Sequence, residues 1–344
     1  MQMLQWIFLI MAILPSWAFA DGESLGHFSF HEFSVSPRMR VEEPKRGGFE
    51  LKETWIGFEW RRDESLSALF GLGSSDLVLP AVWYTPKPQQ LEFVAASVNA
   101  ETPYVNFHAG LLAVPFTYEG EKPEWEWALP ATRVRRQSWF TKRDFGIEFE
   151  FHSGSYLTKV FIHNGEGATN ADNRLWYTGL WQYKDTEGYA ALLSASTGGT
   201  GPESTLGSVA PGPALGFVFD PTQDAKIRLG SLAIFRRWLR HLVLVEVGRG
   251  ETIQLDTKHP FAWGHLDLAW NLGGDLSFLF RYEQTQNDLQ TTETIVKSSA
   301  LGLQISSEDR LSSISLMAVK NQESPEKQND EFLLQFRLNS NFLP

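Results

Sequence analysis

Apolar and polar residues alternate along most of the chain, and the pattern is clearest in residues 145–152. The odd positions there hold Phe or Ile, and the even positions hold Gly, Glu or His. The same alternation returns in residues 276–283 and 332–342. Because successive side chains of a β-strand point to opposite faces, each segment would have one apolar and one polar face. Strands of about 9–11 residues with this pattern are typical of transmembrane barrels. The pattern therefore predicts an all-β fold, a transmembrane antiparallel up-and-down β-barrel.

Turn residues divide these segments into about 16–18 strands, by the spacing expected of barrel strands. We expect strands at 28–39, 49–61, 64–72, 91–99, 103–113, 145–152, 155–163, 174–184, 189–196, 214–219, 225–235, 241–248, 251–255, 261–271, 275–283, 295–305, 311–319 and 331–342. The connections mostly alternate between tight and long, as in bacterial barrels with short periplasmic turns and longer external loops. This alternation predicts that both chain ends lie on the periplasmic side. A β-sandwich has no reason to keep such a phase.

The alternation of tight and long connections is least regular between residues 225 and 260. Apolar residues from Leu232 to Leu242 also fit helical spacing, with arginines on the opposite face. A basic amphipathic helix is therefore an alternative for this segment. The alternating Val243, Val245 and Val247 favour strands, because β-branched residues fit a sheet. A short strand at 251–255 would restore the phase.

The first twenty residues predict how the chain is exported. Residues 6–14 form an apolar run, and Ala18-Phe19-Ala20 is a small-x-small site that precedes Asp21. This pattern indicates a cleaved secretory signal peptide at 1–20, followed by a single outer-membrane barrel domain at 21–344. No later run of 18 apolar residues follows, so we expect no transmembrane helix. A membrane chain without such helices must pair its backbone groups in a closed barrel.

Composition narrows the functional classes. The absence of Cys excludes a disulfide scaffold and a thiolate metal site. A net charge of −11 argues against a nucleic-acid partner. The sequence has no His-Glu-x-x-His motif, so we expect no enzyme activity, no catalytic residues, no metal and no cofactor. The 13 Trp and 25 Phe would suit aromatic girdles at two lipid interfaces. They would equally suit a periplasmic β-sandwich that binds or acts on carbohydrate.

Residues 103–183 carry several motifs in a distinctive order. A strand that ends in residues 109–116 precedes a long loop, and Arg143-Asp144-Phe145-Gly146-Ile147 begins the next strand. A hairpin and Asn164-Gly165-Glu166-Gly167 follow. This order resembles the phosphate-selective porin O/P family of outer-membrane β-barrels. Leu111 stands where that family usually has Gln, and the chain lacks the ladder of lysines that phosphate-selective members place along the pore. The resemblance therefore implies a porin-like barrel.

The long loop at 114–144 is the candidate functional segment. Its first half is acidic and its second half is basic. In porin-like barrels a long early loop folds inward, and opposed charges in a constriction select ions. An outward, solvated loop is the alternative. The predicted constriction residues are Arg133, Arg135, Arg136, Lys142 and Arg143.

The polar faces of the strands contain the remaining predicted lumen residues: Glu148, Glu150, His152, Lys159, Arg281 and Glu283. Together these features predict a porin-like channel for passive diffusion of small hydrophilic solutes or ions. A weak preference for anions would follow from the loop arginines, since charges beyond about 8–10 Å are screened. The expected partners are outer-membrane lipid, the barrel-assembly machinery and the solutes; a homotrimer is possible. A barrel that does not conduct is the remaining alternative.

Overall fold

The computed structural model describes residues 26–42, 46–74, 91–121, 129, 132, 134, 143–165, 174–201, 223–290, 295–307, 312–323 and 330–340. Within these residues the chain forms sixteen β-strands and the short helix α2 (Thr117–Glu121). The strands are β1 (His27–Glu42), β2 (Arg46–Arg61), β3 (Leu66–Ser74), β4 (Leu91–Glu101), β5 (Val105–Ala113), β6 (Arg143–Ser153), β7 (Tyr156–His163), β8 (Trp176–Lys184), β9 (Tyr189–Thr200), β10 (Ala225–Trp238), β11 (His241–Gln254), β12 (Thr257–Gly273), β13 (Leu276–Gln286), β14 (Ile295–Ser306), β15 (Ser312–Glu323) and β16 (Glu331–Ser340). No helix in this part of the chain is long and apolar enough to span a membrane.

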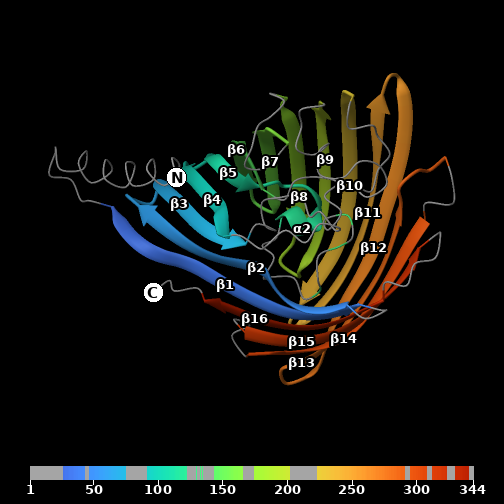
Figure 1. Ribbon diagram of the computed structural model, residues 1–344. Coiled ribbons are helices and arrows are strands. Elements are labelled where there is room, and N and C mark those ends of the chain that lie inside the picture. Colours follow the sequence, from blue (N-terminus) through green and yellow to red (C-terminus); the bar gives the residue numbers. More distant parts are fainter. Residues whose placement is uncertain are drawn as a thin grey trace, which may run out of the picture.

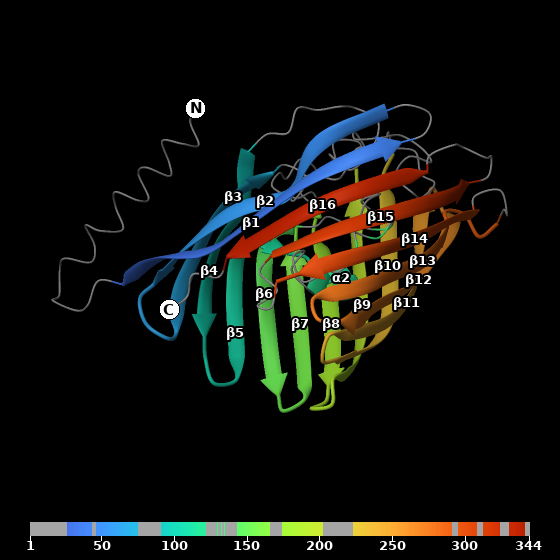
Figure 2. The same cartoon turned by 90° about the horizontal axis from the view of Figure 1, so that it is seen from below.

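The strands form one closed antiparallel barrel (Figures 1 and 2). Each strand pairs with its neighbours in sequence, and β1 pairs with β16, from Phe33 opposite Ser340 to Glu42 opposite Glu331. This last pairing removes the free edges that an open sheet would have. The predicted up-and-down barrel is therefore confirmed, with sixteen described strands at the lower end of the predicted range. A two-sheet sandwich is excluded by the same closure.

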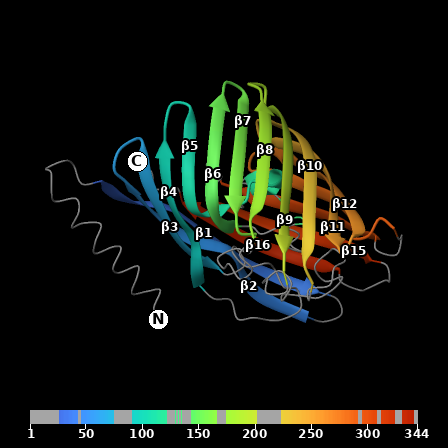
Figure 3. The ribbon, with the colours of Figure 1, turned by 90° about the horizontal axis from the view of Figure 1, so that it is seen from above.

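Short turns gather at one end of the barrel, which we call the turn rim; the opposite end is the loop rim. Turns such as 154–155 and 185–188 join neighbouring strands at the turn rim (Figure 3). Strand β1 begins and β16 ends at this rim, as the sequence predicted. The connection at 255–256 is an exception, because it is tight although it lies at the loop rim.

Residues 225–260 form strands, so the helical alternative and the separate strand at 251–255 were both wrong. Strand β11 runs without interruption through Gly248 and Gly250, which face Trp263 and Phe261 of β12. A Cβ at Gly248 would lie 2.1 Å from the Trp263 ring, and one at Gly250 would lie 2.3 Å from the Phe261 ring. These glycines therefore make room for two large rings and do not end the strand. The predicted strand at 214–219 lies outside the described residues.

Burial alternates along the strands, as the sequence pattern predicted. Phe145, Ile147 and Phe151 are 38–42% exposed on the outer face of β6, whereas Asp144 and Glu148 are buried. Aromatic rings also gather on the outer face near the turn rim. The Tyr156 ring lies 5.8 Å from Trp181 and 5.2 Å from Tyr183 between centroids. Such rings are typical of the interface between lipid and water.

The inner face of β7 to β13 departs from the simple pattern, because much of it is apolar. Two buried clusters join residues of the long loop to this inner wall. In the first, Val114, Phe116 and Val134 pack with Phe161, Trp176, Ile227, Leu229, Phe261 and Trp263. In the second, Tyr118 and Leu129 pack with Leu180, Leu192, Phe235, Leu244 and Leu279, among others. The core of the molecule therefore lies inside the barrel, between the loop and one side of the wall.

Candidate constriction site

The chain turns inward directly after β5, so that helix α2 lies inside the barrel (Figure 1). The Phe116 ring is fully buried, with its centroid 6.2 Å from that of Trp263 on β12. The Tyr118 ring is also buried and lies 4.9 Å from Phe235 on β10 in an edge-to-face contact. Both partners belong to the inner wall, so these rings fix the start of the loop against it.

The first residue of α2 has an unusual backbone conformation. Thr117 has a φ of 68°, a region that a β-branched residue rarely adopts. Its backbone N–H donates to the Ser194 hydroxyl of β9 at 3.1 Å. Conformations of this kind cost about 1–3 kcal/mol and persist where the surroundings enforce them. The contacts of the neighbouring residues with the wall supply that enforcement.

Buried polar contacts hold α2 more specifically. The Tyr118 backbone N–H donates to Glu246 Oε2 of β11 at 2.8 Å, and Arg237 donates to the Tyr118 hydroxyl at 3.3 Å. Glu119 accepts bonds from the Thr132 backbone N–H and hydroxyl, at 2.9 and 2.7 Å. These two bonds tie Thr132, in a later part of the loop, to the helix. Glu119 also forms an ion pair with Arg281 of β13, at 3.2 Å.

Arg281 links the loop to a row of charged residues on three strands. Its Nε donates to Asp267 Oδ1 of β12 at 2.6 Å. His265 Nδ1 lies 3.2 Å from the same Asp267 oxygen, and His265 Nε2 lies 3.8 Å from Glu246. All five residues are at most 6% exposed. We call this set the anchor network: Glu119, Glu246, His265, Asp267 and Arg281.

Sequence reasoning missed most of the anchor network. Of its five residues, Arg281 was predicted on a polar strand face, and Glu119 lay in the acidic half of the loop. No contact between the two was predicted. His265 and Asp267 occupy alternate positions in the otherwise apolar stretch 260–270 of β12, which is the one signal that could have marked them. Their partners lie on other strands, and no local spacing connects them.

Of the predicted constriction residues, Arg133, Arg135, Arg136 and Lys142 lie outside the described residues. Arg143 begins β6, and its guanidinium carbon lies 5.6 Å from the centroid of the Trp55 ring on β2. Three strands separate β6 from β2 in the wall. The contact therefore joins two strands that are not neighbours in the wall, and the place of Arg143 in a constriction stays a prediction.

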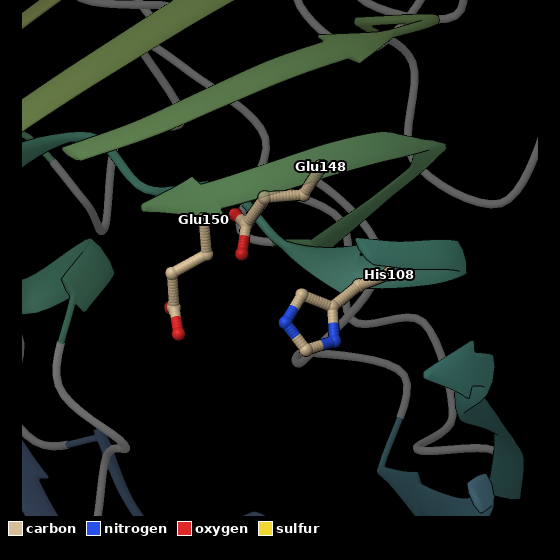
Figure 4. Close-up of side chains that lie close together, drawn as sticks. All are labelled: His108, Glu148 and Glu150. Carbon is tan, nitrogen blue, oxygen red and sulfur yellow. The ribbon is translucent and has the colours of Figure 1, made fainter. Parts of the chain in front are cut away.

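A second group of charged residues lies on β5 to β7. Figure 4 shows His108, Glu148 and Glu150, whose nearest ligand atoms all lie within 4.8 Å of one another. Lys159 Nζ lies 2.9 Å from Glu150 and 3.7 Å from Glu148. The lysine ammonium therefore takes the position in which a cation would balance the two carboxylates. We interpret the group as an ion-pair cluster and not as a metal centre.

The remaining predicted wall residues lie on the same side of their strands. His152 Nε2 is 2.6 Å from Glu150 Oε1, two positions along β6, although the His152 side chain is exposed. Glu283 is 4% exposed and stands opposite His265 in the strand register. All six predicted wall residues thus share the face opposite the outward apolar row. Their role as lining for a solute path stays a prediction.

A further buried chain connects the two motifs that prompted the family resemblance. Asp144 Oδ2 lies 2.5 Å from His163 Nδ1 and also accepts a bond from the Gly165 backbone N–H. His163 Nε2 lies 2.8 Å from the Thr178 hydroxyl. An acid, a histidine and a hydroxyl in this order suggest a hydrolase triad. Thr178, however, is 1% exposed and already bonded to Ser196 at 2.8 Å, so the chain braces the wall.

Gly165 explains why the second motif contains glycine. Its φ is 84°, in the left-handed region that glycine adopts without strain. An added Cβ would lie 2.0 Å from the Trp176 ring. Glycine at this position therefore lets the chain leave β7 in a sharp turn.

Solved structures of outer-membrane proteins resemble this barrel at low sequence identity. A loop-deletion mutant of OmpT, an outer membrane protein of Vibrio cholerae, matches with a TM-score of 0.66 and 8% identity, over 92% of this chain and 100% of that one. The outer membrane channel DcaP of Acinetobacter baumannii matches with a TM-score of 0.63 and 9% identity, over 92% and 97%. The anion-selective porin from Comamonas acidovorans matches with a TM-score of 0.63 and 10% identity, over 92% and 100%.

No protein-family model and no curated protein matches the sequence. Identities of 8–10% carry information about the fold alone. The matches support the all-β barrel fold that the strand pairing shows. The chain has the fold of the porin-type transmembrane β-barrels.

Proposed function

We propose that this chain is an outer-membrane channel through which small hydrophilic solutes or ions diffuse passively. The observation that carries the proposal is the inward-folded loop. Its helix α2 is fixed to the inner wall by the anchor network, by two aromatic contacts and by the bond from Thr117 to Ser194. A barrel that served only as a scaffold would not need a loop held inside it by buried charges, which are costly to bury unless paired.

The same proposal places the protein in the cell envelope. A signal peptide at residues 1–20 would direct export, and the barrel-assembly machinery would insert the mature chain. The turn rim would then face the periplasm, as is usual for short turns in bacterial barrels. Residues 1–20 lie outside the described residues, so cleavage is tested by sequencing the N-terminus of the membrane-extracted protein. A mature N-terminus at Asp21 is the expected result.

Ion preference is the finer part of the proposal. The described carboxylates inside the barrel are only partly balanced by cations, because Glu119 and Asp267 share Arg281, and Glu148 and Glu150 share Lys159. The basic half of the loop would have to outweigh this remaining negative charge at the narrowest point. We infer a weak preference for anions, which depends on Arg133, Arg135 and Arg136 lying in the pore. The phosphate selectivity of the family that residues 103–183 resemble is not part of this proposal.

Planar-bilayer recording tests the channel directly. The purified full chain should insert with discrete conductance steps, and a salt gradient should give a small reversal potential of the sign expected for anions. Liposome swelling with neutral sugars of increasing size would then give the exclusion limit. A folded, heat-modifiable barrel that produces neither current nor swelling would refute the proposal and leave a structural barrel.

A further inference from the structure

The outer face of the barrel carries a hollow of about 620 Å³ across β7 to β10. Gly179 of β8 and Ala195 of β9, which stand opposite each other, form its floor, and Gly230 of β10 continues the same row. A Cβ added at Gly179 would meet no atom within 4 Å. The next outward row toward the turn rim holds larger side chains, including Trp181 and Leu193. Three small residues in a row thus leave a depression in an otherwise bulky apolar wall.

Basic residues surround the loop-rim end of this hollow. Lys226 and Arg228 line it from the start of β10, and Arg249 of β11 stands opposite Gly230. All three side chains are exposed on the outer face. The described outward residues of β9 to β11 in this half contribute a single carboxylate, Glu251, which pairs with Arg228 at 2.8 Å. The end of the hollow therefore carries a net positive charge.

We propose that this hollow binds one phosphate-bearing lipid of the leaflet at the loop rim. An acyl chain would lie along Gly179 and Ala195, and a phosphate group would contact Lys226 and Arg228. The charge complementarity carries the choice of ligand, because arginine and lysine near a membrane surface attract anionic head groups and arginine forms paired bonds with phosphate. The proposal rests on the proposed function only for the orientation, which puts the loop rim in the outer leaflet.

Native mass spectrometry of the full chain tests the site. The protein would be mixed with equal amounts of a bisphosphorylated acylated diglucosamine lipid and the same lipid without phosphate. We expect one phosphorylated lipid retained per chain, and much less of the other. The double variant Lys226→Gln/Arg228→Gln should retain the phosphorylated lipid roughly 30-fold less well, since each basic residue contributes to the attraction. Gly179→Leu should reduce retention of both lipids, because it fills the hollow.

Arg236→Gln is the matched control. Arg236 is also on the outer face of β10, but it lies at the turn rim, over the Tyr189 ring at 4.2 Å. This variant should retain both lipids as the parent does. Equal retention by the parent and by all variants would overturn the lipid site. The lipid site would also be overturned if the Gly179→Leu variant kept its lipid but no longer formed cross-linked oligomers. That result would mean that a second copy of the chain covers the hollow.

Conductance of the same samples separates this proposal from the channel proposal. The hollow is on the outer face, so filling it should leave the single-channel conductance unchanged. If the parent protein retains the lipid but never conducts, the channel proposal is refuted and the lipid site stands. If the parent conducts but retains neither lipid, only the lipid site is refuted.

Discussion

Replacement of Arg281 by methionine should loosen the inward loop and destabilise the barrel. Methionine keeps much of the apolar volume but removes the two contacts with Asp267 and the 3.2 Å ion pair with Glu119. Both acidic side chains are at most 4% exposed, so their carboxylates would be left buried without their cation. Breaking a buried pair in this way costs about 3–5 kcal/mol. Arg228→Met is the control, because its pair with Glu251 is half exposed and should contribute at most about 1 kcal/mol.

Two measurements follow the Arg281→Met change. Urea unfolding of the barrel in lipid vesicles should show the lower stability, and single-channel records should show a larger, noisier open current as residues 117–121 detach. The triple variant Arg281→Met/Asp267→Asn/Glu119→Gln should recover part of the lost stability, since it removes the stranded charges. The loss should also persist at 1 M salt, because screening acts weakly on buried pairs. A folded Arg281→Met barrel with parental stability and parental current would refute the anchoring role.

Three other changes test the faces and the pore. Leu232→Arg places a charge on the outward apolar face of β10 and should lower the folding stability by about 2–4 kcal/mol. The heat-modifiable fraction after refolding into vesicles should be smaller. An unchanged fraction would mean that residue 232 does not face lipid. Gly248→Ala should destabilise the barrel by about 1–3 kcal/mol through contact with Trp263, whereas Gly179→Ala, which meets open space, should not. Replacement of Arg133, Arg135 and Arg136 by serine should shift the reversal potential toward cations. An unchanged reversal potential would mean that the loop lies outside the pore.

The barrel could be predicted because many strands keep strict alternation between an apolar and a polar face. Strands β6 and β16 are examples, and the tight turns that join alternate pairs of strands, such as β6 and β7, made the strand boundaries recognisable. The prediction weakened where the inner face is apolar as well. In β10, Leu229 and Phe235 point inward while Leu232 and Ile234 point outward, so no period distinguishes a strand from a helix.

The inner apolar face has a cause that sequence patterns do not carry. The loop packs against it, so Leu192, Leu244 and Leu279 are buried by residues from a distant part of the chain. The anchor network shows the same limit, because the ion pair between Glu119 and Arg281 joins residues 162 positions apart. The predicted break between residues 248 and 251 was wrong for a related reason: the rings that need the space at Gly248 and Gly250 belong to the next strand.

The distances along the chain between α2 and its partners also set the order in which the molecule can assemble. The bond from Tyr118 to Glu246 spans 128 residues, and the pair of Glu119 with Arg281 spans 162. Contacts of such separation form only after a large loss of chain entropy, which slows them relative to hairpin pairing. The strands that hold the helix, β11 to β13, must therefore be in register before it can dock. An assembling barrel would pass through a stage with its wall largely formed and its interior still unobstructed, and the constriction would be among the last features to mature.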